Sequence, residues 1–421
     1  MMIRPAAKSR AGLATSRCAR PDQLCVFLLR KLLPSFFAFA LLAMPIFAQS
    51  GSSPAPYASM NRSDVAYRGP GRGSAKDLSG EVTTIGVLLP LRGTRAAQGA
   101  ALRATAQMAL DDELASANGT TGHHLTLAFR DESERWGQAS SEMVQLIDQE
   151  HAIALITPAD GNIAHQAEQI ANKIGVPILT LSSDATTTRI NIPWIFRLGP
   201  SDADQAQLIA ADIYQQRNLR KVLLIAEDDH DGRVGAEEFL RAANLLHAIP
   251  PERVDFNPAT SDMAALHDVL KSKRPDAIVL WVSPEAAGIL LPALHPAAPS
   301  AVTYLCSKAL QFSMPTQSSQ PWFSASRLSP TTGRTLNFTA RYRQQTGHEP
   351  TVAAREIYDA VRLLAAAVRV AGPNRARVRD YLASGAIYSG LGGPVSFDKA
   401  GNSQGEDVLQ GPAGPSIQAV F

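Results

Sequence analysis

Residues 82–118 read VTTIGVLLPLRGTRAAQGAALRATAQMALDDELASAN, and this stretch decides the fold. Its first eight residues form an apolar run that ends before Pro90, which is typical of a strand. After a short loop, apolar residues recur at helical spacing, namely Leu102, Ala106, Ala109, Leu110 and Leu114. The stretch therefore predicts a strand, a loop and a long helix.

The same strand-and-helix unit repeats along the rest of the chain. Strands are predicted at 82–89, 125–130, 153–157, 177–181, 221–226, 253–256, 276–281 and 301–305. Helices are predicted at 96–117, 137–149, 163–174, 202–216, 233–245, 262–272, 285–293, 331–346, 350–371 and 374–383. Short, wholly apolar strands are expected where helices cover both faces of a parallel sheet. The alternation predicts a doubly wound α/β fold.

The predicted strands fall into two runs, one before about Pro200 and one after Lys221. This division predicts two similar α/β lobes, as is usual for a chain of 421 residues. In open α/β sheets, ligands bind at the carboxyl ends of the strands. Two lobes that face each other therefore predict a cleft for a small ligand.

Charge and composition exclude some classes of partner. The chain is 45% hydrophobic and 19% charged, which is ordinary for a protein with a packed core. Residues 1–48 hold seven basic residues and one acid; without them, 33 basic residues face 37 acidic ones, a net charge of about −4. The remainder contains no basic block, so neither nucleic acid nor anionic lipid is expected as a partner.

The N-terminal segment has the pattern of an export signal. Arg30 and Lys31 precede the uncharged run LLPSFFAFALLAMPIFA at 32–48, which ends on the small residue Ala48. We expect a secretory signal at 1–48 that is cut near Ala48; an uncleaved membrane anchor is the alternative. Residues 49–80 are rich in Gly, Ser and Pro and predict a flexible linker.

Six ordered segments resemble the branched-chain amino-acid-binding proteins of bacterial ABC importers. They read PLRGTRAAQGAALRATAQMALDDELASANG (90–119), LAFRDESERWGQASSEMVQLIDQE (127–150), VPILTLSSDATTTR (176–189), WIFRLGPSDADQAQLIA (194–210), YRQQTGHEPTVAAREIYDAVRLLAAAV (342–368) and GGPVSFDKAGNSQG (392–405). Their order and spacing hold from about Val82 to the C-terminus. The resemblance implies a type I periplasmic-binding-protein fold, a periplasmic location and a membrane permease as partner.

That fold consists of two α/β lobes joined by a three-stranded hinge, so each lobe is discontinuous in sequence. The resemblance places the first lobe at 81–202 and 325–405. It places the second lobe at 203–324 and 406–421. The lobes are expected to close around the ligand.

The resemblance also implies where the ligand's head group binds. In the family, a polar loop after the third strand and a hydroxyl-rich turn after the fourth strand contact it, and strand-to-helix turns suit a carboxylate because they expose unpaired donors. Two further contacts to the head group come from the second lobe of family members: one residue at the start of a helix and one after a later strand. The matching positions here are Thr157, Asp160, Gly161, Asn162, Ser182, Ser183, Asp184, Asp231 and Lys308.

Three of these positions depart from the family pattern. Asp184 stands where a hydroxyl is usual, and an ionised carboxylate only accepts hydrogen bonds. Asp231 stands where an aromatic residue is usual, and Lys308 where an acid takes the ligand's ammonium. These departures indicate a ligand other than an ordinary branched-chain amino acid: a neutral amide or sugar-like molecule, a cation, or no ligand at all. Asp184 could also be the N-cap of the following turn and point away from the cleft.

Metal and catalytic sites are not expected. Five residues match the spacing of a calcium loop, namely Glu227, Asp229, Asp231, Gly232 and Glu238. The segment before them is a predicted strand, however, and the alternative is a turn with acids near a helix N-terminus. The nine histidines form no ligand-spaced pair with cysteines. We find no nucleophile elbow, phosphate loop or dinucleotide fingerprint, so no cofactor, metal or catalytic residue is predicted.

These patterns predict an exported solute-binding protein of an ABC importer, which binds an amino-acid-like or amide ligand without chemistry. The first alternative is a sensory or regulatory protein, or a scaffold, that keeps the fold but signals to a partner protein. The second is an enzyme that uses Asp184 and Asp231 as paired acids, although their positions on two lobes disfavour it.

Overall fold

The computed structural model describes residues 77–116, 124–132, 137–312, 322–327, 331–411 and, for the backbone alone, 414–418. The predicted secretory signal and residues 49–76 of the predicted linker lie outside these ranges. Residues 77–80 of the linker are held in place, because Leu78 N donates to Pro373 O at 2.7 Å and Asp77 pairs with Arg377 at 2.8 Å. None of the helices within the described ranges has the length and apolar character needed to span a membrane.

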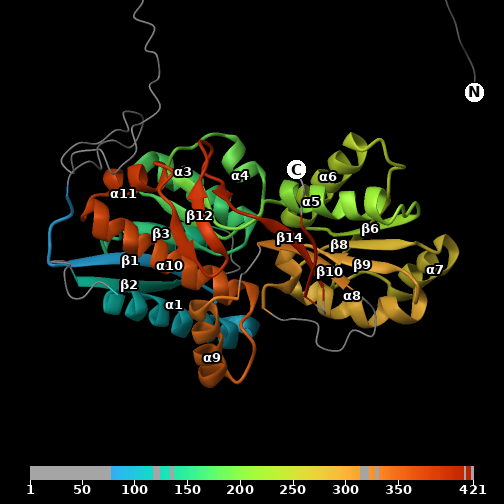
Figure 1. The fold of residues 1–421 in the computed structure, drawn as a ribbon, viewed down its shortest axis with the longest axis horizontal. Helices are drawn as coiled ribbons and strands as arrows, with labels where there is room; N and C mark the ends of the chain where they lie inside the picture. Colours follow the sequence, from blue (N-terminus) through green and yellow to red (C-terminus); the bar gives the residue numbers. More distant parts are fainter. Residues whose placement is uncertain are drawn as a thin grey trace, which may run out of the picture. The chain divides into compact units, whose positions relative to one another are not determined.

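The first lobe is built on a five-stranded, all-parallel sheet with the order β2-β1-β3-β4-β5 (Figure 1). Its strands are β1 (Val82–Leu89), β2 (His124–Asp131), β3 (Ala154–Thr157), β4 (Ile178–Thr180) and β5 (Ile195–Arg197). Its helices are η3 (Gly93–Arg95), α1 (Ala96–Ser116), α2 (Gln138–Asp148), α3 (Gly161–Ile174), α4 (Thr186–Arg189), α9 (Gly333–Thr346), α10 (Val352–Ala371) and α11 (Arg375–Leu382). A small sheet of β11 (Tyr388–Gly390), β12 (Gly393–Phe397) and β13 (Ser403–Gln404) completes the lobe.

Helices cover both faces of this first sheet. Successive strand residues point to opposite faces, so Val87 of β1 packs with residues of α1 and α10, whereas Leu88 packs with residues of α2 and α3. All four residues of β3 are buried. This is the burial that its apolar sequence predicts, because a strand covered on both faces has no polar side.

The second lobe is built on a seven-stranded sheet with the order β15-β14-β10-β9-β8-β6-β7. Its strands are β6 (Val222–Glu227), β7 (Glu252–Phe256), β8 (Ala277–Trp281), β9 (Val302–Leu305), β10 (Trp322–Arg327), β14 (Asp407–Gly411) and β15 (Gly414–Gln418). Its helices are α5 (Asp202–Ala210), which continues as the π-helix η4 (Ala211–Gln216), α6 (His230–Leu245), α7 (Met263–Lys273), α8 (Pro284–Ala297) and η5 (Ser307–Leu310). Figure 1 shows α5 and α6 on one side of this sheet and α7 and α8 on the other.

The chain passes between the lobes three times: from β5 to α5, from β10 to α9, and from β13 to β14. Ser403, on the third passage, joins all three. Its hydroxyl accepts from Gly199 N at 3.0 Å on the first passage, and it lies 3.3 Å from Arg327 Nη2, which begins the second. These contacts fix the three connections against one another. The predicted doubly wound fold with a three-stranded hinge is confirmed.

The structure adds strands that the sequence does not predict, namely β5, β10 and β11 to β15. β5 has only three residues, and β12 contains Gly393 and Pro394, which usually mark turns. β10 pairs with β9 as far as Ser324 and with β14 as far as Arg327, which lies three residues beyond the predicted end of the second lobe's first segment. The division of the chain into lobes at the predicted residues otherwise stays a prediction.

Candidate functional site

A cavity of about 550 Å³ lies at the carboxyl ends of the strands of both sheets. The first lobe contributes Leu89 at the end of β1, Pro158 after β3 and Leu181 after β4. The second lobe contributes Glu227 at the end of β6 and Ser283 after β8. This is the edge at which open α/β sheets bind ligands, because the loops that follow parallel strands meet there.

The wall of this cavity is partly apolar and partly acidic. The apolar part includes Leu89, Pro90, Leu102, Leu181, Phe312 and Ile357. The charged lining residues that the structure describes are Arg95, Glu132, Asp160, Glu227, Asp229, Glu285 and Lys308, five of them acidic and two basic. Both bases already have partners, since Arg95 lies 2.9 Å from Glu132 and Lys308 pairs with Asp231. The excess charge facing the cavity is negative.

Two of the predicted ligand contacts, Asp160 and Lys308, line this cavity. Asp160 is also the N-cap of α3, because its Oδ1 accepts from Ile163 N at 2.9 Å. Lys308 is half-buried beside three acids; desolvation opposes its charge, but the attraction of Asp231, Asp160 and Asp229 outweighs this and raises the pKa of its ammonium. Lys308 therefore stays charged in the cavity wall.

Asp231 and Gly161 meet across the two lobes. The backbone N–H of Gly161, the first residue of α3, donates to Asp231 Oδ1 at 3.0 Å and Oδ2 at 3.3 Å. The other partner of the Asp231 carboxylate is the ammonium of Lys308. A helix N-terminus and a lysine are the groups expected to bind a ligand's carboxylate. Here the protein's own Asp231 fills that position.

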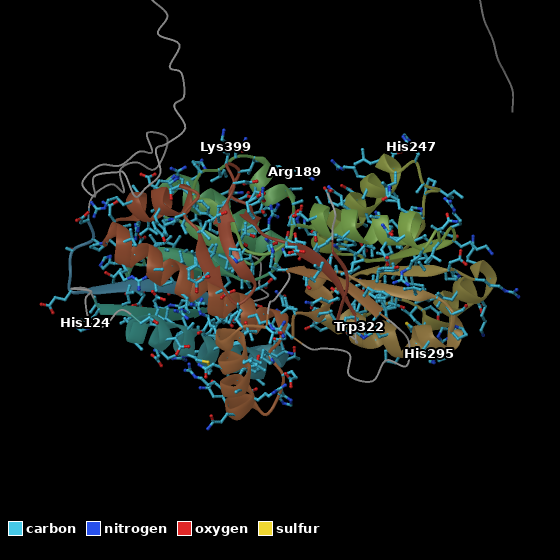
Figure 2. The ribbon with its side chains drawn as sticks, viewed as in Figure 1. His124, Arg189, His247, His295, Trp322 and Lys399 are labelled. Atoms are coloured by element: carbon cyan, nitrogen blue, oxygen red, sulfur yellow. The ribbon has the colours of Figure 1, made fainter. Side chains whose placement is uncertain are left out.

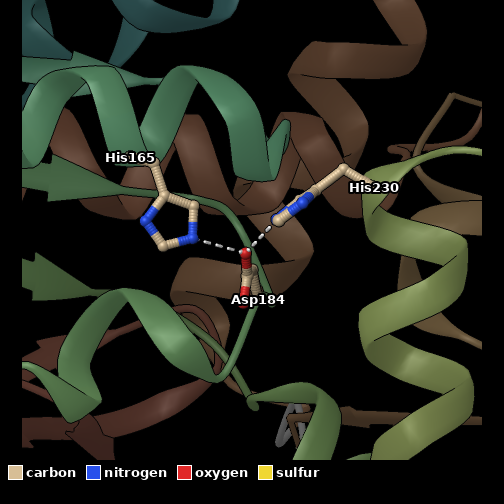
Figure 3. A group of neighbouring side chains, drawn as sticks. All are labelled: His165, Asp184 and His230. Carbon is tan, nitrogen blue, oxygen red and sulfur yellow. Dashed lines mark hydrogen bonds and ion pairs between the residues drawn. The ribbon is translucent and has the colours of Figure 1, made fainter.

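Asp184 is 1% exposed and lies between two histidines (Figure 3). Its Oδ2 is 3.0 Å from Nε2 of His165 on α3 and 2.8 Å from Nε2 of His230, the first residue of α6. Its Oδ1 accepts from the backbone N–H of Thr186 at 2.8 Å and from the hydroxyl of the same residue at 2.7 Å. Asp184 thus connects the turn after β4 with a helix of each lobe.

The charges of this cluster depend on one another. Burial disfavours the charged form of Asp184, but the hydrogen bonds from His165, His230 and Thr186 outweigh it and lower the pKa of its carboxyl. In return, Asp184 and then Glu168 raise the pKa of His165 to about 10. Both acids are therefore paired within the protein: Asp184 lies between the two histidines, and Asp231 pairs with Lys308.

The remaining predicted contacts lie off the cavity wall. Thr157 is fully buried, and its hydroxyl has no hydrogen-bond partner among the described residues. Ser182 is also buried, and its hydroxyl accepts from Asp184 N at 3.2 Å. The Ser183 carbonyl accepts from Asp202 N at 2.7 Å, and Asn162 is exposed. As ligand contacts, all four stay predictions.

The acids that match a calcium loop have separate partners. Asp229 is the N-cap of α6, and Glu227 Oε2 accepts from Ser283 N at 2.6 Å. Glu238 pairs at 2.6 Å with Arg189, which comes from the first lobe and is labelled in Figure 2. The alternative of a strand-to-helix turn with acids near the helix N-terminus describes this segment.

Sequence reasoning missed His165 and His230, and also Glu132, Arg95 and Glu285 of the cavity wall. The two histidines are far apart in the chain and lie on different lobes, so no local spacing connects them. One signal was present: His165 lies about one turn into the helix that follows the predicted binding loop.

Replacing Gly161 with alanine tests the contact between the lobes. A Cβ at this position would lie 2.3 Å from Asp231 Oδ1 and 2.9 Å from Asp184 Oδ2. We expect Gly161→Ala to separate Asp231 from α3 and to increase the radius of gyration in small-angle X-ray scattering, with circular dichroism unchanged. Gly333→Ala is the matched control, because Gly333 also begins a helix and has nothing within 4 Å. An unchanged radius in Gly161→Ala would contradict the interlobe contact.

Glu132 gives stability a dependence on pH. Burial raises the pKa of Glu132 to about 7, although Arg95 opposes the shift. The folded chain therefore keeps a proton that the unfolded chain releases near pH 4.5, and stability falls as pH rises from about 4.5 to 7. We expect Glu132→Gln to gain about 2–3 kcal/mol relative to wild type between pH 5 and pH 8 in urea unfolding. Glu285→Gln, which alters an exposed acid 3.9 Å from the same Arg95, should show no such gain.

Comparison with known proteins agrees with this architecture. A family model for periplasmic binding proteins matches residues 82–409. A Leu/Ile/Val-binding protein homolog of Brucella melitensis biotype 1 is 25% identical over 217 residues, 51% of this chain and 58% of that protein. Glutamate receptor 3.4 of Arabidopsis thaliana is 29% identical over 178 residues, 41% of this chain and 18% of the receptor. The chain thus spans less than two thirds of the length of these curated relatives.

Solved structures share the fold. The branched-chain amino acid transporter substrate-binding protein LivJ of Streptococcus pneumoniae, in complex with isoleucine, has a TM-score of 0.70 at 22% identity and covers 80% of this chain and 100% of its own. A solute-binding protein of an ABC transporter from R. palustris, in complex with benzoate, has a TM-score of 0.68 at 18% identity. The match covers 80% of this chain and 95% of that protein. The chain therefore belongs to the periplasmic binding protein family, and it shares its type I fold with branched-chain amino-acid-binding proteins.

Proposed function

We propose that the chain is an exported solute-binding protein of an ABC importer, which binds a small polar ligand between its lobes. The observation that carries the proposal is the 550 Å³ cavity at the carboxyl ends of both sheets, with walls from both lobes. A cavity of this size suits a small molecule. Closure of the lobes about the hinge would present both of them to a membrane permease. No chemistry on the ligand is required.

The chemistry of the cavity narrows the class of ligand. Its wall has five acids and two already paired bases, so it favours a molecule with an ammonium or several N–H donors. Phe312, Leu102 and Ile357 add an apolar surface that suits a hydrophobic part. Asp231 occupies the N-terminus of α3, where a ligand's carboxylate would bind. We therefore propose an amino-acid-like amide or amine without a free carboxylate in that position.

A sensory or regulatory protein is the second candidate. The carboxylate of Asp231 at Gly161 and the His230–Asp184 contact hold the lobes together through the protein's own side chains. A chain that closes in this way could report to a partner protein instead of delivering a solute. Similarity to plant glutamate receptors, which are named as receptors, is in keeping with a role in sensing.

Removing the Asp231 carboxylate should change which ligands bind. In Asp231→Ala, the N–H of Gly161 and the ammonium of Lys308 lose their partner and can accept a ligand's carboxylate. We expect the variant to bind leucine at least tenfold more tightly than wild type in isothermal titration calorimetry. Asp228→Ala, in the same turn but with an exposed side chain, is the control. Equal leucine affinity in wild type and Asp231→Ala would show that Asp231 does not exclude carboxylates.

Transport and sensing can be separated in cells. A thermal-shift screen of amines, amides and amino acids first identifies the ligand. Cells that lack the chain should then lose high-affinity uptake of the labelled ligand and regain it when the wild-type chain is restored. Unchanged uptake, together with an altered response to the ligand, would contradict the importer proposal and support the sensory one.

A further inference from the structure

Three side chains with metal-binding atoms converge between the lobes (Figure 3). His165 comes from α3, Asp184 from the turn after β4, and His230 from the start of α6. One ligand atom from each lies within 4.8 Å of the other two. The first two residues belong to the first lobe and the third to the second lobe, so a bound ion would join the lobes.

A fourth residue, Glu168, orients the first histidine. It lies one turn further along α3, is 2% exposed, and its Oε2 is 3.0 Å from His165 Nδ1. Metal-bound histidines usually donate their second N–H to a carboxylate in this way, which turns the other nitrogen toward the ion. His165 is thus placed as a metal ligand, and Glu168 as the carboxylate that orients its ring.

Each ring nitrogen of His165 faces an acidic side chain. A neutral imidazole has a single N–H, but both nitrogens of His165 face carboxylate oxygens, of Glu168 and Asp184, at 3.0 Å. When Nδ1–H donates to Glu168, the Nε2 lone pair faces the Asp184 oxygen. Two acceptors at this distance repel each other unless a positive charge lies between them. Without an ion, that charge is the second proton of His165, and a metal ion would take the place of this proton.

The geometry suits a tetrahedral ion. Ligand atoms about 2.0–2.1 Å from Zn²⁺ in a tetrahedral site lie about 3.3 Å from one another. The two nitrogen-to-oxygen distances here are 3.0 Å and 2.8 Å, so a small outward movement of the imidazoles would admit the ion. Two imidazoles and one carboxylate are ligands that zinc prefers, and they leave a fourth position for water.

We propose that His165, Asp184 and His230 bind one divalent transition-metal ion of the zinc class, which joins the two lobes. This site differs from the sequence-based expectation of no metal. It is also separate from the organic-ligand cavity, because neither histidine nor Asp184 lines that cavity. Binding of the ion requires both lobes, since His230 is the only one of the three ligands on the second lobe. The ion therefore stabilises the closed arrangement in the absence of any organic ligand.

The test uses full-length protein that is purified without a histidine tag, treated with chelator and dialysed. Zn²⁺ is titrated by isothermal titration calorimetry, and Co²⁺ is followed by its visible absorption. Wild type should bind one ion per chain with a tetrahedral cobalt spectrum. His165→Gln and His230→Gln should each lose this binding. Glu168→Gln should weaken it about 10- to 100-fold, because it removes the support of a ligand without removing a ligand.

His124→Gln is the matched control, because His124, labelled in Figure 2, is exposed at the start of β2 and is not one of the three clustered residues. This variant should bind the ion like wild type. Circular dichroism and thermal unfolding of every variant show that the chain is folded. No binding by folded wild type would overturn the proposal and assign the charge in the cluster to a proton. Equal binding by wild type, His165→Gln and His230→Gln would overturn it as well.

Small-angle X-ray scattering tests the joining of the lobes. Zn²⁺ should decrease the radius of gyration of wild type and of His124→Gln, and leave that of His230→Gln unchanged. Stoichiometric binding without any difference between wild type and His230→Gln in this measurement would contradict a site that spans the two lobes. These readouts do not depend on the organic ligand, so they stand or fall separately from the importer proposal.

Discussion

The carboxylate of Asp231 at the N-terminus of α3 is the contact between the lobes on which the proposed ligand selection depends. Helix N-termini attract anions because their N–H groups are unpaired and the helix dipole is positive there. In this protein the anion is supplied by the other lobe, and Lys308 neutralises it. One interaction thus connects the lobes and removes the group that a ligand's carboxylate would use. The cavity beside it keeps an acidic and apolar wall.

Near the hinge, a buried arginine holds the turn that carries Asp184. Arg197, at the end of β5, is 1% exposed, and its guanidinium donates to the carbonyl of Asp184 at 2.5 Å and to Asn402 Oδ1 at 2.6 Å. The turn that carries Asp184 is therefore tied to the residue that precedes β13, the last strand before the third passage. These hydrogen bonds offset part of the cost of burying a charged guanidinium.

Much of the fold could be predicted from the sequence because burial on both faces of a sheet makes its strands wholly apolar. The run at 153–157 shows this pattern, and β3 lies there. The short β5 and the glycine-containing β12 give no such signal, since their pairing is decided by the neighbouring strands. The predicted loop and turn after β3 and β4 do lie at the carboxyl edge of the sheet. The partners of their side chains could not be predicted, because Asp184 meets His230 only through the tertiary fold.

The most direct test of this account is the electron density in a crystal of the protein purified from its own periplasm without added ligand. The account predicts density for a small molecule in the cavity beside Phe312 and Glu132, with Asp231 still bound to Gly161 N. Density for a ligand carboxylate at Gly161 N, with Asp231 displaced, would contradict it. That result would show that the chain binds a ligand's head group at the positions that its family resemblance implies.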